Sequence, residues 1–332
     1  MTNNSVDLSI VIPVYNAMPL LQRTLDSVFG QHTSYSFEVI MVDDGSSDNS
    51  VEYIKSRPEE NIVLLQQENA GPATARNRGV NVARGRYCAY LDADDYWMDG
   101  FIEQTVSFLD TNKKCVAVSV GQRHLTVSGE GVKPSCINEY NHPFVLGDFW
   151  SFWAQYMHVC TGSAVIRTEV LRNTGGQRSD LRVTEDLEFW ALIATYGKWG
   201  FIPEVLFVSD GTGLVTDRES WIRKMSVRWN YAPSVEDWQH RIVERLKEQS
   251  PELPQGFLSA RGKVAETLIY CQMISERYSL SKTEVLEYGD SFNKGSMTTV
   301  MRLCRHSSVL WWMLCKMLKW REYHRYLKSA TN

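Results

Sequence analysis

The sequence predicts an α/β protein built on a doubly wound, mostly parallel sheet and followed by an α-helical extension. Three observations support this fold class. Short apolar runs of strand length alternate with segments of helical periodicity from the start of the chain. Two of these runs end abruptly in clusters of aspartate. Beyond about residue 215 the strand pattern stops, and long segments with helical spacing follow.

The expected elements come in a regular order. Apolar runs typical of strands covered on both faces lie at 8–14, 37–42, 62–65, 86–91, 115–120, 163–167 and 201–208. Helical spacing begins at Leu20 and at Val51 and covers 73–83, 99–112 and 184–196. Residues 121–160 are expected to form loops and short helices. In the extension, helical segments are expected at 221–231, 235–249, 257–276, 282–293 and 298–327, separated by prolines and Gly295.

These elements suggest two domains. We expect an α/β domain at 1–215, which divides into halves at about 1–120 and about 121–215. The helical extension then covers 216–332. The sequence carries no signal for the oligomeric state.

Composition narrows the class of protein. The net charge of −4 and the absence of a basic run with interleaved aromatics in the first 200 residues argue against a nucleic-acid-binding protein. The seven cysteines never form a C-x-x-C pair, which favours a reducing cytosol over a disulfide framework or a zinc site. No signal peptide and no run of roughly 18 apolar residues is present, so we expect a cytoplasmic protein.

Carboxylates follow two of the expected strands. Asp43 and Asp44 follow strand 37–42, and Asp92-Ala93-Asp94-Asp95 follows strand 86–91. The carboxyl ends of parallel strands meet at one edge of a sheet, where open α/β sheets bind their ligands. Clustered carboxylates repel one another, so we expect a hard cation there, Mn²⁺ or Mg²⁺. For such a motif alone, a solvated acidic turn is the alternative.

Five motifs resemble, in order and spacing, those of the inverting glycosyltransferases of family 2. They are Ile12-Pro-Val-Tyr-Asn16, Val42-Asp-Asp-Gly-Ser-Ser-Asp48, Asn69-Ala-Gly-Pro-Ala-Thr-Ala-Arg-Asn-Arg-Gly79, Asp92-Ala-Asp-Asp95 and Thr184-Glu-Asp186. The resemblance covers about residues 8–210. It implies the nucleotide-sugar-binding fold called GT-A and a nucleoside-diphosphate sugar as donor. It implies nothing about residues 215–332.

The resemblance implies a nucleotide-sugar site. Its expected residues are Pro13, Tyr15, Asn16, Asp44, Arg76, Asp92 and Ala93. Uracil presents an N–H donor between two carbonyl acceptors, so a carboxylate at Asp44 would select it and favour a UDP-sugar. Pro13 and Tyr15 would shape the base pocket.

Other residues near this site have alternative explanations. For Asp43, capping of the following turn is the alternative to a ligand contact. Arg76 would donate to the uracil or the diphosphate. Its alternative, shared by Arg78, is a solvated place on a helix face.

The departing diphosphate explains the expected metal. A divalent ion bridging both phosphates stabilises the charge that develops there, and Asp94 is the expected metal ligand. Asp92 would face the ribose or a metal-bound water, and Asp95 would support the cluster. Some relatives complete the metal shell with a late histidine. None lies in the matching region here, so the third ligand stays open, with Asp210 as a candidate.

Inversion requires a base for the attacking hydroxyl. Asp186 falls where the family's base stands, at the start of a helix. The alternative is an acid that complements the helix dipole. Glu185 is the natural control, because adjacent helical residues point in different directions.

The rest of the chain bears on the acceptor. Aromatic residues and histidines in 141–163, among them His142, Trp150, Trp153 and His158, with Gly162, could contact a sugar acceptor or simply form core. The Q-x-x-R-W motif of processive synthases is incomplete here, because Met225 stands in place of glutamine before Arg228-Trp229. We therefore expect non-processive transfer of one hexose or N-acetylhexosamine to a surface glycan or its lipid-linked precursor.

The C-terminal segment is basic and rich in tryptophan. Residues 297–332 hold seven Lys or Arg and one acid, Glu322. Such a helix suits an anionic membrane surface, which would make the protein peripheral to the membrane. The alternative is a helix packed onto the protein or a partner.

Two other classes of function remain. A nucleotidyltransferase is disfavoured because neither a G-x-x-x-x-G-K-[ST] loop nor a G-x-G-x-x-G fingerprint is present. A non-catalytic sugar-nucleotide-binding scaffold would be expected to lack key acids, but Asp44, Asp94 and Asp186 are all present.

Overall fold

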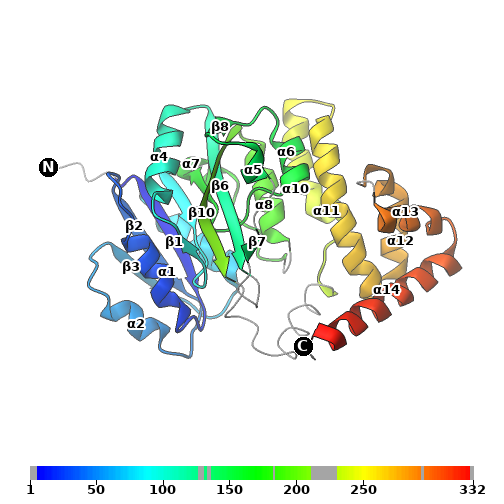
Figure 1. Cartoon of the computed structure of the whole chain (residues 1–332), viewed down its shortest axis with the longest axis horizontal. Coiled ribbons are helices and arrows are strands. Elements are labelled where there is room, and N and C mark those ends of the chain that lie inside the picture. The colour runs from blue at the N-terminus through cyan, green and yellow to red at the C-terminus, as the bar shows by residue number, and fades with distance from the viewer. Residues whose placement is uncertain are drawn as a thin grey trace. The chain divides into compact units, whose positions relative to one another are not determined.

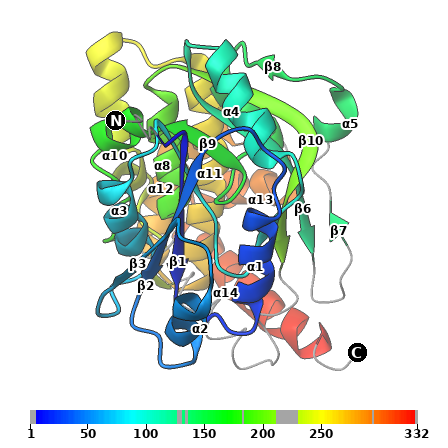
Figure 2. The same cartoon turned by 90° about the vertical axis from the view of Figure 1, so that its left-hand side faces the viewer.

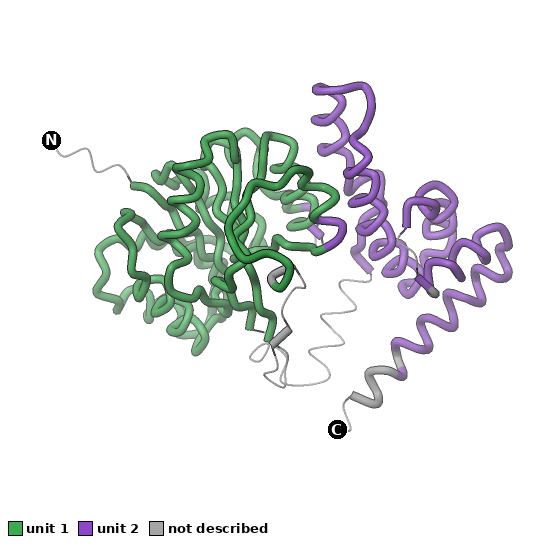
Figure 3. The backbone as a smooth tube through the Cα atoms, turned by 45° about the horizontal axis from the view of Figure 1, so that its top comes forward, with its two compact units in different colours: residues 1–152, 156–179, 185–214 green, residues 153–155, 180–184, 215–332 purple. Residues whose placement is uncertain are grey.

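The computed structural model describes residues 6–125, 131–132, 136–181, 184–210, 230–292 and 295–329 (Figure 1). The chain divides into two compact units, coloured in Figure 3. Unit 1 holds residues 1–152, 156–179 and 185–214, and unit 2 holds 153–155, 180–184 and 215–332. The predicted domain boundary at 215 and most of the helix predicted at 221–231 lie outside the described residues.

Within the described residues, unit 1 is built on a ten-stranded sheet whose main path is β3-β2-β1-β4-β9-β6-β10-β5. Four parallel strands form one half, namely β1 (Leu8–Val14), β2 (Phe37–Asp43), β3 (Ile62–Gln66) and β4 (Tyr87–Tyr90). The other half contains β5 (Tyr96–Trp97), β6 (Cys115–Leu125), β9 (Ala164–Arg167) and β10 (Lys198–Asp210). Strand β9 runs antiparallel to β4 and β6, whereas β6 and β10 are parallel to each other.

Helices cover both faces of this sheet. One face carries α1 (Leu20–Phe29), α2 (Ser50–Ser56) and α4 (Phe101–Thr111), which share a core with alternate residues of β1. The other face carries α3 (Pro72–Val82), α7 (Thr168–Asn173) and α8 (Glu185–Ala194). In Figure 2 the strands of the parallel half lie between α3 on the left and α1 and α4 on the right.

Close packing on the second face explains one glycine of the α3 motif. A Cβ atom on Gly79 would lie 2.3 Å from the side chain of Val11 in β1. Because β1, β2 and β4 are mostly buried on both faces, most of their residues are apolar, with buried polar exceptions such as Ser9 and Glu38. The predicted doubly wound α/β fold is therefore confirmed.

Some details differ from the sequence-based expectation. Strands β6 and β10 extend beyond the predicted apolar runs, because they pair with each other through Asp210 and Leu125. The polar residues in this paired region form no apolar run in the sequence, so these strand ends were not predicted. The expected loops and short helices between 121 and 160 include the strands β7 (Gly131–Val132) and β8 (Phe144–Val145) and the helices α5 (Cys136–Glu139) and α6 (Phe149–Tyr156).

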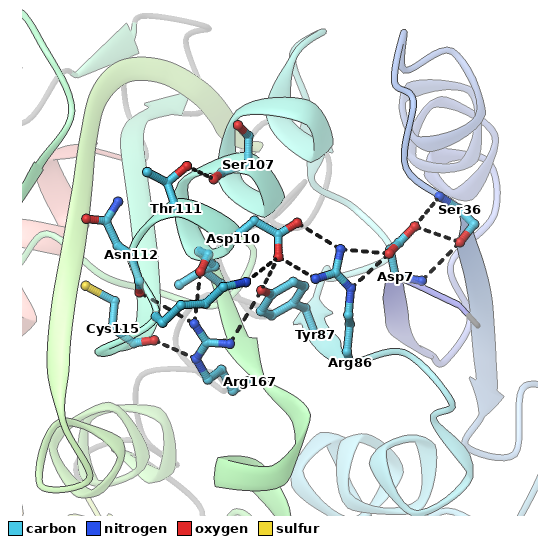
Figure 4. Close-up of polar contacts among 12 residues, drawn as sticks. Asp7, Ser36, Arg86, Tyr87, Ser107, Asp110, Thr111, Asn112, Cys115 and Arg167 are labelled. Atoms are coloured by element: carbon cyan, nitrogen blue, oxygen red, sulfur yellow. Dashed lines mark hydrogen bonds and ion pairs between the residues drawn. The ribbon is translucent and has the colours of Figure 1, made fainter.

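Ion pairs hold the amino ends of the parallel strands, at the end of the sheet opposite the acid clusters (Figure 4). Arg86, just before β4, pairs with Asp7 before β1 (2.8 Å) and with Asp110 of α4. Arg167, the last residue of β9, donates to the main-chain carbonyl of Cys115 at the start of β6 (2.8 Å). This network joins strands that are far apart in the sequence.

Unit 2, taken by itself, is helical. Its elements are α10 (Val235–Gln249), α11 (Gln255–Ile274), α12 (Tyr278–Tyr288), the 3₁₀ helix η1 (Gly289–Ser291), α13 (Ser296–Cys304) and α14 (Ser308–Ser329). Helix α11 is central, because α10, α12 and α14 all pack against it. None of the helices in the described residues is long and apolar enough to cross a membrane.

The prediction of one helix over 298–327 is wrong. The helix is interrupted at residues 305–307, between α13 and α14. The hydroxyl of Ser307 accepts the main-chain N–H of Leu310 (3.3 Å) and so begins the second helix. Because apolar and basic residues continue across the interruption, the sequence pattern did not indicate the N-cap at Ser307.

Asp110→Asn tests the network at the amino ends of the strands. Hydrogen bonds from Arg86 hold the pKa of Asp110 well below its ordinary value. Such a carboxyl stabilises the fold above its unfolded pKa of about 3.9, and this stabilisation is lost as the pH falls below it. We expect the variant to lose about 1 kcal/mol at pH 7 and progressively less toward pH 2, measured by urea unfolding.

The matched control is Asp26→Asn, because Asp26 makes one ion pair, with Arg57, on the exposed surface. It is expected to change the stability by less than about 0.5 kcal/mol. A stability loss in Asp110→Asn that stays constant from pH 7 to pH 2 would contradict the role assigned to the ion pairs.

Candidate active site

Asp44 lies just after β2 and is buried. Its carboxylate accepts the main-chain N–H of Ala70 and of Gly71 (both 2.8 Å), one on each oxygen, and the side-chain amide of Gln67 (2.7 Å). Gly71 has a φ of 88°, which lets the chain turn into α3 at Pro72. Three of about four acceptor positions are thus filled, and one remains for a ligand donor.

The loops after β1 and β2 are bonded together. The side-chain oxygen of Asn16 accepts the N–H of Ser47 (2.8 Å), and the N–H of Asn16 donates to the hydroxyl of Ser46 (3.0 Å). Asp43 accepts the N–H of Ser46 (3.1 Å), which is the turn capping weighed as its alternative role. Asn16 therefore orders the aspartate loop, whereas the ring of Tyr15 is 56% exposed beside it.

Pro13 and Ala93 lie close to these loops through the sheet. Pro13 is within β1, where it pairs with Val42 of β2. The carbonyl of Ala93 accepts the hydroxyl of Thr24 in α1 (2.9 Å), which fixes the main chain of the acidic motif. Both residues thus help to fix the main chain at the edge of the sheet that carries the acidic residues.

Arg76 of α3 is buried and surrounded by carboxylates. Its guanidinium pairs with Asp92 (2.6 Å). Burial by itself lowers the pKa of Arg76, but the carboxylates of Asp92, Glu185 and Asp186 outweigh burial and raise it. A solvated place on a helix face is therefore wrong for Arg76. Arg78 donates to the main-chain carbonyl of Gln66 (2.7 Å).

Gln177 is a residue of this site that the sequence analysis missed. Its side-chain oxygen accepts a hydrogen bond from Arg76 (3.2 Å). The amide of Asn77 holds the main chain of Gln177 from both sides, as donor and as acceptor (2.8 Å each). A Cβ atom on Gly176 would lie 2.6 Å from the Asn77 oxygen. The Gly175-Gly176 pair was the only signal in the sequence.

The acid cluster after β4 includes a buried carboxyl with a raised pKa. Burial, together with the charges of Asp92 and Asp94, raises the pKa of Asp95 to about 8. The main-chain N–H of Asp210 donates to Asp95 (2.8 Å). The carboxylate of Asp210, the candidate third metal ligand, pairs with Arg23.

The last of the five motifs joins the same group. Helix α8 begins at Glu185, and Thr184 before it has a φ of 64°, an unusual conformation for a β-branched residue. Burial and the charges of Asp186 and Asp92 raise the pKa of Glu185. Burial and the charges of Asp95, Asp186 and Asp92 also raise the pKa of the Cys160 thiol. Carboxylates from the end of β4 and the start of α8 therefore lie close enough to influence one another's charge state.

A model of glycosyl transferase family 2 matches residues 9–175, half of the chain. The chain belongs to this family. The predicted resemblance is confirmed, although the match ends before Glu185 and Asp186.

Similar proteins carry the same family name or fold. Glycosyltransferase GlyA of Streptococcus pneumoniae is 27% identical over 73% of this chain and 34% of its own length. An Escherichia coli protein named UDP-Glc:alpha-D-GlcNAc-diphosphoundecaprenol beta-1,3-glucosyltransferase WfaP is 35% identical over 32% of this chain and 42% of its own length. The matched stretches thus span less than half of each of these relatives.

The crystal structure of Staphylococcus aureus TarS 1–349 matches with a TM-score of 0.55 at 18% identity. The match covers 85% of this chain and 89% of that chain. The same fragment of TarS has been solved with UDP and with UDP-GlcNAc. The likeness confirms the fold expected of this family.

The acidic residues fit a metal that the substrate helps to hold. In the described residues, no three His, Cys, Asp or Glu side chains are grouped so as to hold a metal ion by themselves. Mg²⁺ at nucleotide sites is typically bound by one or two carboxylates together with substrate phosphates. A cation beside Asp94 would offset the charge that raises the pKa of Asp95. Asp94 as the metal ligand stays a prediction.

The aromatic residues expected at the acceptor site lie in the core. Trp150 and Trp153 are buried. His158 is packed between the rings of Phe152 and Phe201, neither ring nitrogen has a hydrogen-bond partner, and burial lowers its pKa to about 3. A role in core packing, the alternative weighed for these residues, is therefore the observed one.

Two flanking residues of the same segment differ from that core. His142 is exposed. Gly162 accepts the indole N–H of Trp97 on its carbonyl (2.7 Å), and a Cβ atom there would lie 2.2 Å from the ring of Phe207. Gly162 is thus required by packing.

Asp44→Asn tests how much this aspartate contributes to the stability of the fold. Asparagine has one acceptor oxygen, so the N–H of Ala70 or of Gly71 would lose its partner. We expect a loss of about 1–3 kcal/mol in the free energy of unfolding, measured with urea. Asp43→Asn keeps the single oxygen that Ser46 uses and is expected to lose less than half as much. Equal losses in the two variants would contradict this assignment.

Proposed function

We propose that this family 2 protein is a metal-dependent, inverting glycosyltransferase that moves one sugar from a UDP-sugar to a hydroxyl acceptor. The observation that carries the proposal is the buried Arg76, on which the charges of Asp92, Glu185 and Asp186 act, beside the acidic motif that also holds Asp94. At the carboxyl edge of an α/β sheet, these carboxylates would supply both a metal-binding group and a proton-accepting group.

Relatives support the donor and acceptor classes. The fold neighbour TarS binds UDP and UDP-GlcNAc, as the titles of its structures state. WfaP is named for a UDP-glucose donor and a lipid-linked GlcNAc acceptor. We propose a UDP-hexose or UDP-N-acetylhexosamine donor and, as acceptor, a surface glycan or its lipid-linked precursor.

Each residue has a proposed role. Asp44 would accept the uracil N3–H in its remaining acceptor position, beside the exposed ring of Tyr15. Asp92, fixed by Arg76, would bind the ribose, and Asp94 would hold the cation. Mn²⁺ or Mg²⁺ would supply electrostatic stabilisation of the departing diphosphate.

Asp186 is proposed as the general base. The acceptor oxygen forms a bond to C1 of the sugar as the bond from C1 to the diphosphate oxygen breaks. The bonding electrons leave with UDP, and the hydroxyl proton passes to the carboxylate of Asp186. Attack from the face opposite UDP inverts the configuration at C1. The positive charge of Arg76 offsets the repulsion among Asp92, Glu185 and Asp186.

The protein is proposed to act in the cytoplasm and to transfer one sugar per encounter. The six cysteines whose side chains the structure describes are free thiols, which suits a reducing compartment. The incomplete Q-x-x-R-W motif supports the non-processive mode. Its residues at 225–229 lie outside the described part of the chain.

Asp186→Asn tests the transfer mechanism. With a panel of UDP-sugars, the wild-type chain is expected to transfer the sugar to an added acceptor or to water and to release UDP. The variant should release UDP at least about 100-fold more slowly while still binding UDP, because a positioned base typically contributes 10²–10⁴-fold. The measurement is coupled detection of UDP, together with UDP binding by calorimetry.

Glu185→Gln is the control, since this neighbouring carboxylate also acts on the charge of Arg76. It should reduce the rate by less than about tenfold. Equal losses in the two variants would overturn the assignment of Asp186. If the wild-type chain released UDP from no sugar nucleotide, a non-catalytic binder would replace the proposed enzyme.

A further inference from the structure

Helix α14, red in Figure 1, has two apolar faces. The inner face is buried through Trp311, Leu314, Cys315 and Leu318, at spacings of three and four residues. The indole N–H of Trp311 donates to the hydroxyl of Ser281 in α12 (3.1 Å). This face fixes the helix within unit 2, so a position packed on the protein is confirmed for one side of the helix.

The outer face is apolar and open. At 100° per residue, five side chains fall on the side opposite the buried face. They are 50–62% exposed, and they are Val309, Leu310, Met313, Met317 and Trp320. A continuous exposed apolar row of this kind on a monomer marks a surface that meets another apolar phase.

Cations border this row on both sides. Lys316 and Lys319 lie on one side and Arg321 on the other, each with its side chain about half exposed. The two lysines share one carboxylate, Glu276 (2.6 and 3.1 Å), so one positive charge is left over.

The acid of α14, Glu322, pairs with one of these cations, Arg321 (3.4 Å). Glu322 is buried on the inner side, where it accepts the hydroxyl of Tyr270 in α11 (2.5 Å). Among the described side chains, the three cations beside the outer row thus face two acids, Glu276 and Glu322, and one net positive charge remains.

We propose that the outer face of α14 docks on an anionic lipid surface. The apolar row would enter the boundary between headgroups and acyl chains, with Trp320 at that boundary and the cations at the level of the lipid phosphates. A second copy related by a twofold axis would set this border, with its net positive charge, against itself. The proposal is independent of sugar transfer, because α14 holds none of the active-site residues.

The test is flotation of the full chain with vesicles of phosphatidylcholine containing phosphatidylglycerol, against vesicles of phosphatidylcholine alone. We expect binding to the anionic vesicles that weakens at high salt. Met313→Glu, which puts a charge in the centre of the row, should raise the lipid concentration for half-binding by about tenfold or more. The matched control is Met98→Glu, a methionine of unit 1 that is 44% exposed and outside the row.

The outcomes separate the proposal from its rivals. Loss of binding in Met313→Glu with retention in Met98→Glu supports docking by this face, provided that both variants keep the wild-type circular dichroism spectrum. Absence of wild-type binding to anionic vesicles, or equal binding by Met313→Glu, overturns it. A wild-type dimer in light scattering that Met313→Glu converts to a monomer, without vesicle binding, assigns the face to a second copy instead.

Discussion

The structure of the active site depends on the compensation of charge around one buried guanidinium. An unpaired ion in a protein interior costs several kcal/mol, and a cluster of carboxylates repels itself. Arg76 meets both constraints, because it is buried and faces Asp92, Glu185 and Asp186. The ends of β4, α3 and α8 are thereby drawn to one place. Gln177, held by Asn77, keeps the guanidinium in position from the remaining side.

The same logic divides the two ends of the sheet. At the amino ends, Arg86 pairs with Asp7 and Asp110, and Arg167 donates to the main-chain carbonyls of Cys115 and Leu109. At the carboxyl ends, burial together with the charges of Asp92 and Asp94 raises the pKa of Asp95. The ion pairs at the amino ends serve stability, whereas the acids at the carboxyl ends are the groups that we propose for the cation and the substrate.

The sequence was sufficient for the parallel half of the fold, because apolar strands and the helices between them follow the local periods of 2 and 3.6. It could not predict that β9 runs antiparallel between β4 and β6, since strand direction depends on distant pairing. Motif spacing located Asp44 and Arg76, but not the burial of Arg76 or the part played by Gln177. The burial of Arg76 and the contact of Gln177 depend on tertiary contacts, such as those of Asn77, that cannot be predicted from a local sequence pattern.

The helical extension shows a similar limit. Basic residues and tryptophans in the last segment suggested a membrane-facing helix or a packed one, and the sequence could not choose. The structure separates the two properties by face, because Trp311 and Leu318 are buried whereas Met313 and Trp320 are open. Average hydrophobicity along the helix hides this division, since both faces are apolar.

The central claim is that the acidic edge of the sheet is a metal-assisted site for a uridine nucleotide. The most direct measurement is calorimetric titration of the purified chain with UDP and with GDP, each with and without Mn²⁺, repeated on Asp94→Ala. The account predicts that UDP binds at least about tenfold more tightly with the metal and that Asp94→Ala removes this difference. Preference for GDP, or no binding of either nucleotide at millimolar concentration, would contradict it.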